Sequence, residues 1–105
     1  MPKTNTPSAD MAQAIDIPTN VYATYTDGTA VLMETRTGRY IGLDEVGTRI
    51  WQLLTELRDP AKVVTAMDAE YDAPRERLEQ DLAAFIRQCR DRGLLAPAGP
   101  SAGVG

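Results

Sequence analysis

The chain has 105 residues, with 15 acidic and 11 basic side chains and a net charge of −4. It contains no histidine, a single cysteine and two serines, which stand near the two ends of the chain as Ser8 and Ser101. A Ser-His-Asp or Cys-His nucleophile needs an imidazole to accept a proton, and a zinc site needs several Cys or His ligands. The composition therefore excludes these enzyme classes, and we expect no catalytic residue, no metal and no cofactor.

The distribution of residue types divides the chain into three parts. Five of the seven prolines lie outside residues 20–95, whereas all six aromatic residues lie inside them. We therefore expect a flexible N-terminal arm over residues 1–19, a folded domain over residues 20–95 and a flexible C-terminal tail over residues 96–105. No apolar run approaches the roughly 20 residues that span a bilayer, and no signal peptide is evident, so we expect a cytoplasmic protein without membrane contact.

The first half of the expected domain has the pattern of a β-meander. Residues 21–26 are β-branched and aromatic, and the Asp27-Gly28 dipeptide that follows them favours a tight hairpin turn. We expect a second strand over residues 29–35 and, after another turn, a short third strand over residues 39–43. The three strands are predicted to pair antiparallel.

The second half has the 3.6-residue period of amphipathic helices. Asp44 is a plausible N-cap of the first helix, Asp59 and Pro60 open the second, and Pro74 lies in the first turn of the third. Gly93 fits the position just after the last helix. The predicted fold class is α+β, with the order β-β-β-α-α-α and three helices that cover one face of the sheet.

Several conspicuous residues are best explained by packing. Cys89 lies on the apolar stripe of the third helix, which predicts a buried thiol. Trp51 is expected in the core. Gly47 lies inside a helix, where glycine costs about 1 kcal/mol relative to alanine, and so indicates the close approach of another element. The arginines of residues 75–92 alternate with acidic residues around their helix, which is typical of a solvated surface and not of a DNA-recognition helix.

The third strand is an edge in this meander. Its unpaired N–H and C=O groups are either protected, by the shortness of the strand, by Arg39 or by a covering segment, or they capture an extended peptide by strand addition. Tyr40 and Gly42 point to one side of the sheet, and Arg39, Ile41 and Leu43 point to the other. Which set meets the core depends on the register and stays open here.

Residues 38–54 read G-R-Y-I-G-L-D-E-V-G-T-R-I-W-Q-L-L. This segment resembles the signature of PqqD-like proteins, in which a turn glycine precedes a short strand that ends in Leu-Asn or Leu-Asp and a helix with Gly, Ile and Leu at fixed spacing. Asp44 stands where the family commonly has asparagine, and either residue caps a helix. The likeness covers residues 20–95. It implies a winged-helix-like fold and a non-enzymatic element that binds the leader of a ribosomally synthesised precursor peptide.

Within this family the chain looks most like the stand-alone leader-binding proteins of lasso-peptide biosynthesis. That likeness implies two further partners, a leader peptidase and an ATP-dependent cyclase. It also implies that the leader adds as a strand beside the third strand and lies between this strand and the third helix. Carried onto this chain, the implied peptide-binding residues are Arg39, Tyr40, Ile41, Gly42, Leu43, Glu79, Leu82, Ala83, Ile86 and Arg90.

The third helix offers two flanks for such a groove. On the first flank, Leu82 and Ile86 would form the floor of an apolar pocket, and the small Ala83 would leave room for a leader side chain. Glu79 and Arg90 would stand at its rim. The opposite flank, with Arg77, Asp81 and Gln88, is the alternative.

Two other functions remain as alternatives. A winged-helix protein could bind nucleic acid or act as a regulator, but the acidic net charge and the placement of the helices after the strands oppose binding to DNA. The edge strand could instead pair with a second copy of the chain. We expect a monomer without nucleic-acid partners, with an edge-strand dimer as the alternative.

Overall fold

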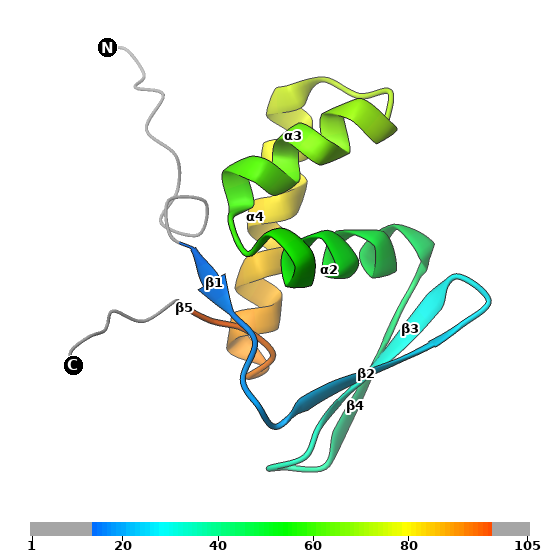
Figure 1. Cartoon of the computed structure of the whole chain (residues 1–105), viewed down its shortest axis with the longest axis vertical. Coiled ribbons are helices and arrows are strands. Elements are labelled where there is room, and N and C mark those ends of the chain that lie inside the picture. Colours follow the sequence, from blue (N-terminus) through cyan, green and yellow to red (C-terminus); the bar gives the residue numbers. More distant parts are fainter. Residues whose placement is uncertain (1–13, 98–105) are drawn as a thin grey trace.

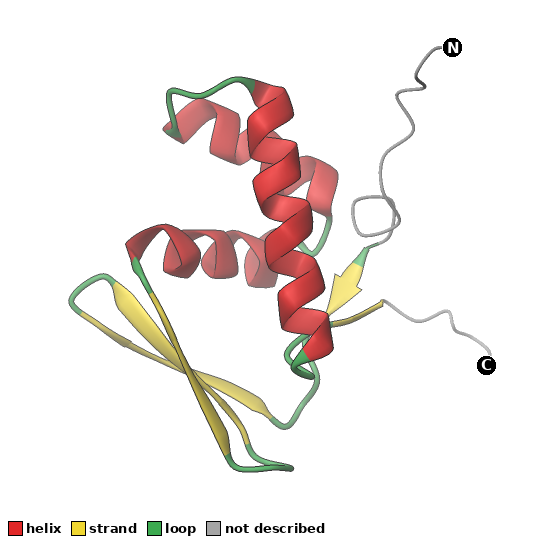
Figure 2. Ribbon diagram, turned by 180° about the vertical axis from the view of Figure 1, so that it is seen from behind, coloured by secondary structure: helices red, strands yellow, loops and turns green. Residues whose placement is uncertain are grey.

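The computed structural model describes residues 14–97, in which a three-stranded sheet lies beside three helices (Figure 1, Figure 2). The strands are β2 (Val21–Thr26), β3 (Thr29–Glu34) and β4 (Arg39–Leu43), and they pair antiparallel in the order β2-β3-β4. The predicted meander is confirmed, and its second strand ends one residue earlier than expected.

The helices are α2 (Glu45–Leu57), α3 (Pro60–Glu70) and α4 (Arg75–Asp91). They confirm the α+β class and the β-β-β-α-α-α order of the central elements. None of the helices within residues 14–97 is long and apolar enough to cross a membrane.

The helix ends follow the signals in the sequence. The Asp59 side chain accepts a hydrogen bond from the N–H of Ala61 at 3.0 Å, and Pro60 is the first residue of α3. Pro74 is the N-cap residue of α4 and makes no side-chain hydrogen bond there. It therefore lies just before the first turn of the helix, and not within that turn as predicted. At the other end of α4, Gly93 has a φ of 75°, which brings the N–H of the next residue back to a carbonyl of the last turn.

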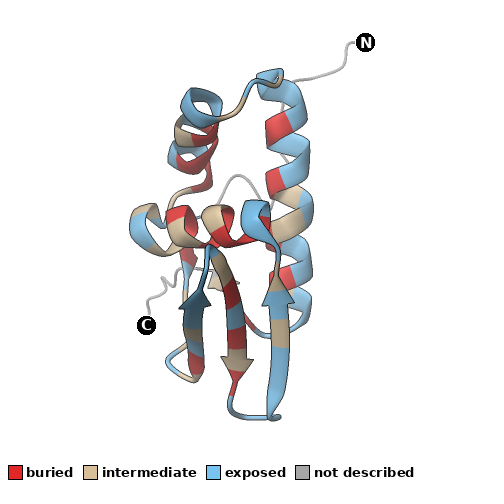
Figure 3. Cartoon of the chain, turned by 90° about the vertical axis from the view of Figure 1, so that its right-hand side faces the viewer, coloured by how far each residue is buried: buried red, intermediate tan, exposed pale blue. Residues whose placement is uncertain are grey.

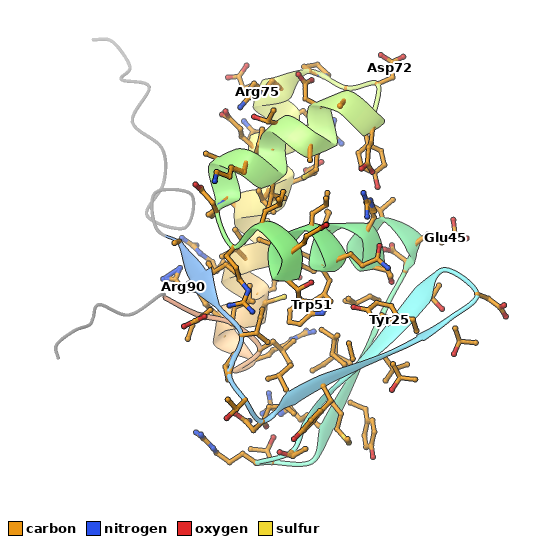
Figure 4. All side chains as sticks on the ribbon, in the orientation of Figure 1. Tyr25, Glu45, Trp51, Asp72, Arg75 and Arg90 are labelled. Carbon is orange, nitrogen blue, oxygen red and sulfur yellow. The ribbon has the colours of Figure 1, made fainter. Side chains whose placement is uncertain are left out.

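The core lies between the sheet and α2 and continues among the three helices. The helix α3 packs against α2 and α4, away from the sheet (Figure 1), so the prediction that all three helices cover the sheet is wrong for α3. Along β3, buried residues alternate with more exposed ones, and this strand lies in the middle of the sheet (Figure 3). Trp51 is 2% exposed and lies between α2 and the sheet (Figure 4). Its predicted place in the core is confirmed, and so is that of Cys89, which is 4% exposed.

A second, two-stranded sheet extends the folded unit beyond residues 20–95. Strand β1 (Ile15–Asp16) pairs antiparallel with β5 (Ala96–Pro97). Ile15 is 3% exposed, and its N–H donates to the carbonyl of Arg58 at 2.9 Å. These strands lie in segments that were expected to be the arm and the tail, and β1 fastens its segment to the end of α2.

Candidate functional site

The turn between β2 and β3 determines where the backbone groups of the sheet point. Asp27 and Gly28 have φ values of 53° and 82°, as a type I′ turn requires. Thr26 and Thr29 pair across this turn, so their own N–H and C=O groups bond one another. Because the direction of hydrogen bonding alternates along a strand, Ala30 and every second residue after it point their backbone groups toward β4.

This alternation identifies the free backbone groups of β4. Arg39, Ile41 and Leu43 pair with those core-facing residues of β3 and use their N–H and C=O groups inside the sheet. Tyr40 and Gly42 point theirs away from β3. Within residues 14–97 no further strand pairs with β4. The open edge therefore presents the N–H and C=O groups of Tyr40 and Gly42.

The same register answers the question that the sequence left open about side chains. Paired residues share a face, so Arg39, Ile41 and Leu43 lie on the side of the sheet that the helices cover. Ile41 and Leu43 are half-buried there, and both pack against the core. Tyr40 lies on the other face and is 70% exposed.

A hollow lies at each end of β4, and α4 contributes to both. The first hollow, of about 260 Å³, lies where β4 passes into α2, and we call it the aspartate hollow. It is lined by Asp44, Val46, Gly47, Ile50, Asp81, Ala84, Phe85 and Gln88. Figure 3 shows β4 on the side of the sheet next to α4.

The second hollow, of about 490 Å³, lies at the start of β4, and we call it the arginine hollow. It is lined by Pro18, Asn20, Glu34, Arg36, Thr37, Arg39, Asp91, Arg92, Gly93, Leu95 and Ala96. The other α4 residues that line the two hollows lie three, four, seven and ten residues after Asp81, so they form one stripe along the helix. We call the strip between β4 and this stripe the β4–α4 groove.

Gly47 shapes the aspartate hollow. A Cβ atom at this position would lie 3.1 Å from Asp44 Oδ1, 3.5 Å from the Cβ of Leu43 and 3.6 Å from the Cε1 of Phe85. The distances to Leu43 and Phe85 are ordinary van der Waals contacts, which a Cβ atom could make, and only the distance to the cap carboxylate is tight. The predicted close approach of another element is therefore not the reason for this glycine, since the tight contact is with the residue that caps the same helix.

The residues expected on the first flank of α4 do not line these two hollows. Leu82 and Ile86 are 0% exposed and belong to the core. Ala83 and Arg90 are half-buried, and Glu79 forms a salt bridge of 3.6 Å with a residue of its own helix. At 100° per residue, Glu79, Ala83 and Arg90 lie on the side of α4 that is opposite the lining of the two hollows.

The opposite flank, which the sequence left as the alternative, supplies the lining. Asp81 and Gln88 border the aspartate hollow, and Arg77 forms an exposed salt bridge of 3.5 Å with Asp81. Sequence reasoning missed Ala84 and Phe85 between them. A helical repeat from Asp81 would have found both, once it was known which flank faces β4.

Glu34 organises the turn that leads into β4. Its side chain is 5% exposed and accepts hydrogen bonds from the N–H groups of Arg36, at 2.8 Å, and Thr37, at 3.0 Å. The hydroxyl of Thr37 and the side-chain amide of Asn20 donate to it as well. The hydroxyl bond of Thr37 is the main cause that lowers the pKa of Glu34, followed by the backbone bonds and the charge of Arg36, against the opposing effect of burial.

Groups for covalent or metal chemistry are not assembled in this region. Within residues 14–97, no three His, Cys, Asp or Glu side chains lie close enough together to hold a metal ion. Burial raises the pKa of the Cys89 thiol to about 12, despite the nearby charge of Arg92. The geometry offers instead an open strand edge beside a hollowed helix flank.

Residues 29–95 match the sequence profile of the family described as coenzyme PQQ synthesis protein D (PqqD). The chain belongs to the PqqD family. A curated relative of this PqqD-family chain, the PqqA binding protein of Rhodopseudomonas palustris (strain TIE-1), is 32% identical over 60 residues. The alignment covers 57% of this chain and 59% of the relative, which is less than two thirds of its length.

Two solved structures share the fold. The structure of TbiB1 in complex with the TbiA(beta) leader peptide is 40% identical to this chain, with a TM-score of 0.75 over 79% of this chain and 96% of the other. The structure of lasso peptide synthetase B1 complexed with the leader peptide is 27% identical, with a TM-score of 0.72 over 80% of this chain and 99% of the other. Both proteins were solved with a leader peptide bound.

Proposed function

We propose that this PqqD-family chain is a non-catalytic module that binds the leader of a ribosomally synthesised precursor peptide by adding it as a strand to β4. The observation that carries the proposal is the open edge at Tyr40 and Gly42, which lies beside the hollowed flank of α4. The leader-peptide complexes of the two similar structures support it, and so does the name of the PqqA binding relative.

In this proposal, β4 binds the leader through its backbone and α4 binds it through side chains. The leader backbone bonds Tyr40 and Gly42, and alternate leader side chains point toward α4. On α4 we place the contacts at Asp81, Phe85 and Gln88. Leu82 and Ile86 keep this flank in position as core residues, and Glu79, Ala83 and Arg90 lie on the opposite side of α4.

We further propose that the bound leader is delivered to a leader peptidase and an ATP-dependent cyclase in a lasso-peptide pathway. The description of one similar structure as a lasso peptide synthetase B1 supports this placement. In this proposal the chain is cytoplasmic and acts as a monomer. A dimer formed through two β4 edges would occupy the same Tyr40 and Gly42 backbone groups that bind the leader.

The open edge can be tested with two variants of one residue. Gly42→Pro removes an edge N–H without taking a bond from β3, and proline is tolerated at such edge positions. Gly42→Ala is the matched control, because it keeps the N–H and its added Cβ meets nothing within 4 Å. The probe is a fluorescein-labelled TbiA(beta) leader peptide, with a scrambled peptide of the same composition as the reference, measured by fluorescence anisotropy.

We expect the native chain and Gly42→Ala to bind the probe with similar affinity, and Gly42→Pro to bind about tenfold more weakly or not at all. Equal affinity of a folded Gly42→Pro variant would count against strand addition at β4. Ile41→Pro is unsuited to this test, since the N–H of Ile41 bonds β3 and its loss disturbs the sheet.

The helix side of the groove can be tested independently. Ala84→Arg places a long side chain in the aspartate hollow, at a position that is exposed and so tolerates the change. Ala69→Arg makes the same change on an exposed position of α3, away from β4. We expect only Ala84→Arg to weaken binding of the leader, with both variants as stable as the parent chain.

A further inference from the structure

The aspartate hollow has acidic walls. Asp44 and Asp81 line it, and none of the described residues that line it is basic. One carboxylate oxygen of Asp44 accepts the N–H of Gly47, which leaves the other oxygen available. Asp81 lies 3.5 Å from Arg77 in a pair that is more than half exposed, and such surface pairs contribute little binding energy.

The arginine hollow has the opposite character. Arg36, Arg39 and Arg92 line it together with Glu34 and Asp91. The Glu34 carboxylate already accepts hydrogen bonds from two backbone N–H groups and two side chains, so its charge is engaged inside the turn. The guanidinium groups therefore dominate this end of the groove.

The pleat of an added strand brings alternate side chains to these two hollows. A residue opposite Ile41 faces the helix-covered side of the sheet, as Ile41 does, and so do the residues opposite Leu43 and Arg39. The outer two of these positions are four residues apart, or about 13 Å along a strand. Leu43 precedes the aspartate hollow and Arg39 lines the arginine hollow, so the added strand spans both.

From this arrangement, which rests on the proposed function, we propose that the groove selects a peptide with a charge pair of fixed spacing. A basic side chain lies at the aspartate hollow and an acidic side chain lies four residues away at the arginine hollow. Between them, opposite the half-buried Ile41, lies an apolar side chain. The occupant is thus an extended segment of the pattern basic-x-apolar-x-acidic.

The order of this pattern follows from the direction of pairing. Every strand pair in the structure is antiparallel, and antiparallel pairing is the more stable geometry for an added strand. The strand β4 runs from the arginine hollow to the aspartate hollow. The N-terminal residue of the pattern is therefore the basic one, and the acidic residue follows it.

A peptide library can test the pattern without knowledge of the natural leader. Random 12-residue peptides displayed on yeast are selected on the full native chain and, separately, on the double variant Arg36→Glu/Arg39→Glu. Both substituted residues are exposed. Lys62→Glu, at an exposed position of α3, is the control for a change of charge away from the groove. Each selected peptide is tested again on Gly42→Pro to identify those that bind β4.

We expect the native chain and Lys62→Glu to enrich basic-x-apolar-x-acidic peptides that lose binding to Gly42→Pro. Each charge contact is expected to change affinity about three- to fivefold. The double variant should enrich peptides in which the acidic position has become basic. Asp81→Lys leaves Asp44 as the one acidic residue among the described residues that line the aspartate hollow, and so neutralises that end. It should remove the preference for a basic residue there, and it serves also if the double variant does not fold.

Two failures are distinguishable. The charge pattern would be overturned, and strand addition left standing, if the selected peptides lost binding to Gly42→Pro and yet carried no charge pair. The same conclusion would follow if peptides selected on the charge variants carried the same pair as those selected on the native chain. If no selected peptide depends on Gly42, strand addition at β4 fails, and the charge pattern fails with it.

Discussion

The backbone N–H of Gly47 donates a hydrogen bond of 2.7 Å to Oδ1 of Asp44, which joins the first turn of α2 to the end of β4. The same glycine leaves room for this carboxylate, since a Cβ atom at residue 47 would lie 3.1 Å from Asp44 Oδ1. The cap and the glycine therefore depend on one another, and both residues line the aspartate hollow.

Asp44→Ala is expected to lower the free energy of unfolding by about 1 kcal/mol, because it leaves an N–H at the start of α2 without its acceptor. Asp44→Asn keeps an oxygen that can accept the same bond and should stay within a few tenths of a kcal/mol of the parent. Urea denaturation followed by circular dichroism measures both. If the two variants lost the same stability, the cap would not be the reason for an Asp at this position.

Ile15→Ala is expected to destabilise the chain by about 2–4 kcal/mol, because a side chain that is 3% exposed leaves a cavity when it is truncated. Thr19→Ala, at an exposed position of the same segment, should change the free energy of unfolding by less than about 0.5 kcal/mol. Thermal and urea denaturation of the full chain provide the measurement. A negligible effect of Ile15→Ala would show that β1 contributes nothing to the stability of the fold.

The order of the central elements was predictable because its signals are local. The Asp27-Gly28 turn, the cap at Asp44 and the change of apolar period each depend on a few neighbouring residues. Strands β1 and β5 carry no such signal. Each has two residues, and each becomes a strand only because the chain ends of the domain meet in the folded structure.

The two elements of the candidate site, β4 and α4, were predictable from the sequence, but the residues that each presents to the groove were not. The alternation along β4 was clear, but whether Ile41 or Gly42 offers its backbone to solvent depends on the register set at Thr26 and Thr29. The apolar stripe of α4 likewise marks its buried side, to which Leu82 and Ile86 belong, but it does not show which flank faces β4. The residues that line the hollow stand beside the stripe, where Phe85 is half-buried and the sequence pattern is mixed.

Glu34→Gln is expected to destabilise the chain at neutral pH, because the turn donates several N–H and O–H groups to a charged carboxylate. The pKa of Glu34 is lowered from 4.5, so the folded state favours the charged form. This stabilisation is complete above pH 4.5 and is lost as the pH falls through the lowered value. The difference in urea midpoint between parent and variant should therefore shrink on acidification. A difference that does not change with pH would mean that charge plays no part.

Cys89 is expected to react very slowly with thiol reagents in the folded chain. Its side chain is 4% exposed, and its pKa of about 12 against the usual 9.0 leaves about a thousandfold less thiolate at neutral pH. Labelling followed by mass spectrometry should be complete in urea and minimal without it. Rapid labelling of the native protein would contradict the packing of α4.

Thiol labelling can also show whether a bound peptide covers the β4–α4 groove. In a Cys89→Ala background, Gln88→Cys moves the thiol to an exposed position that lines the aspartate hollow. It should label quickly in the free protein and at least several-fold more slowly with saturating TbiA(beta) leader peptide, because a strand on β4 covers this flank of α4. Glu79→Cys, exposed on the opposite side of the same helix, is the control and should label at one rate in both states. Protection of Glu79→Cys in place of Gln88→Cys would show that the peptide binds the opposite flank of α4.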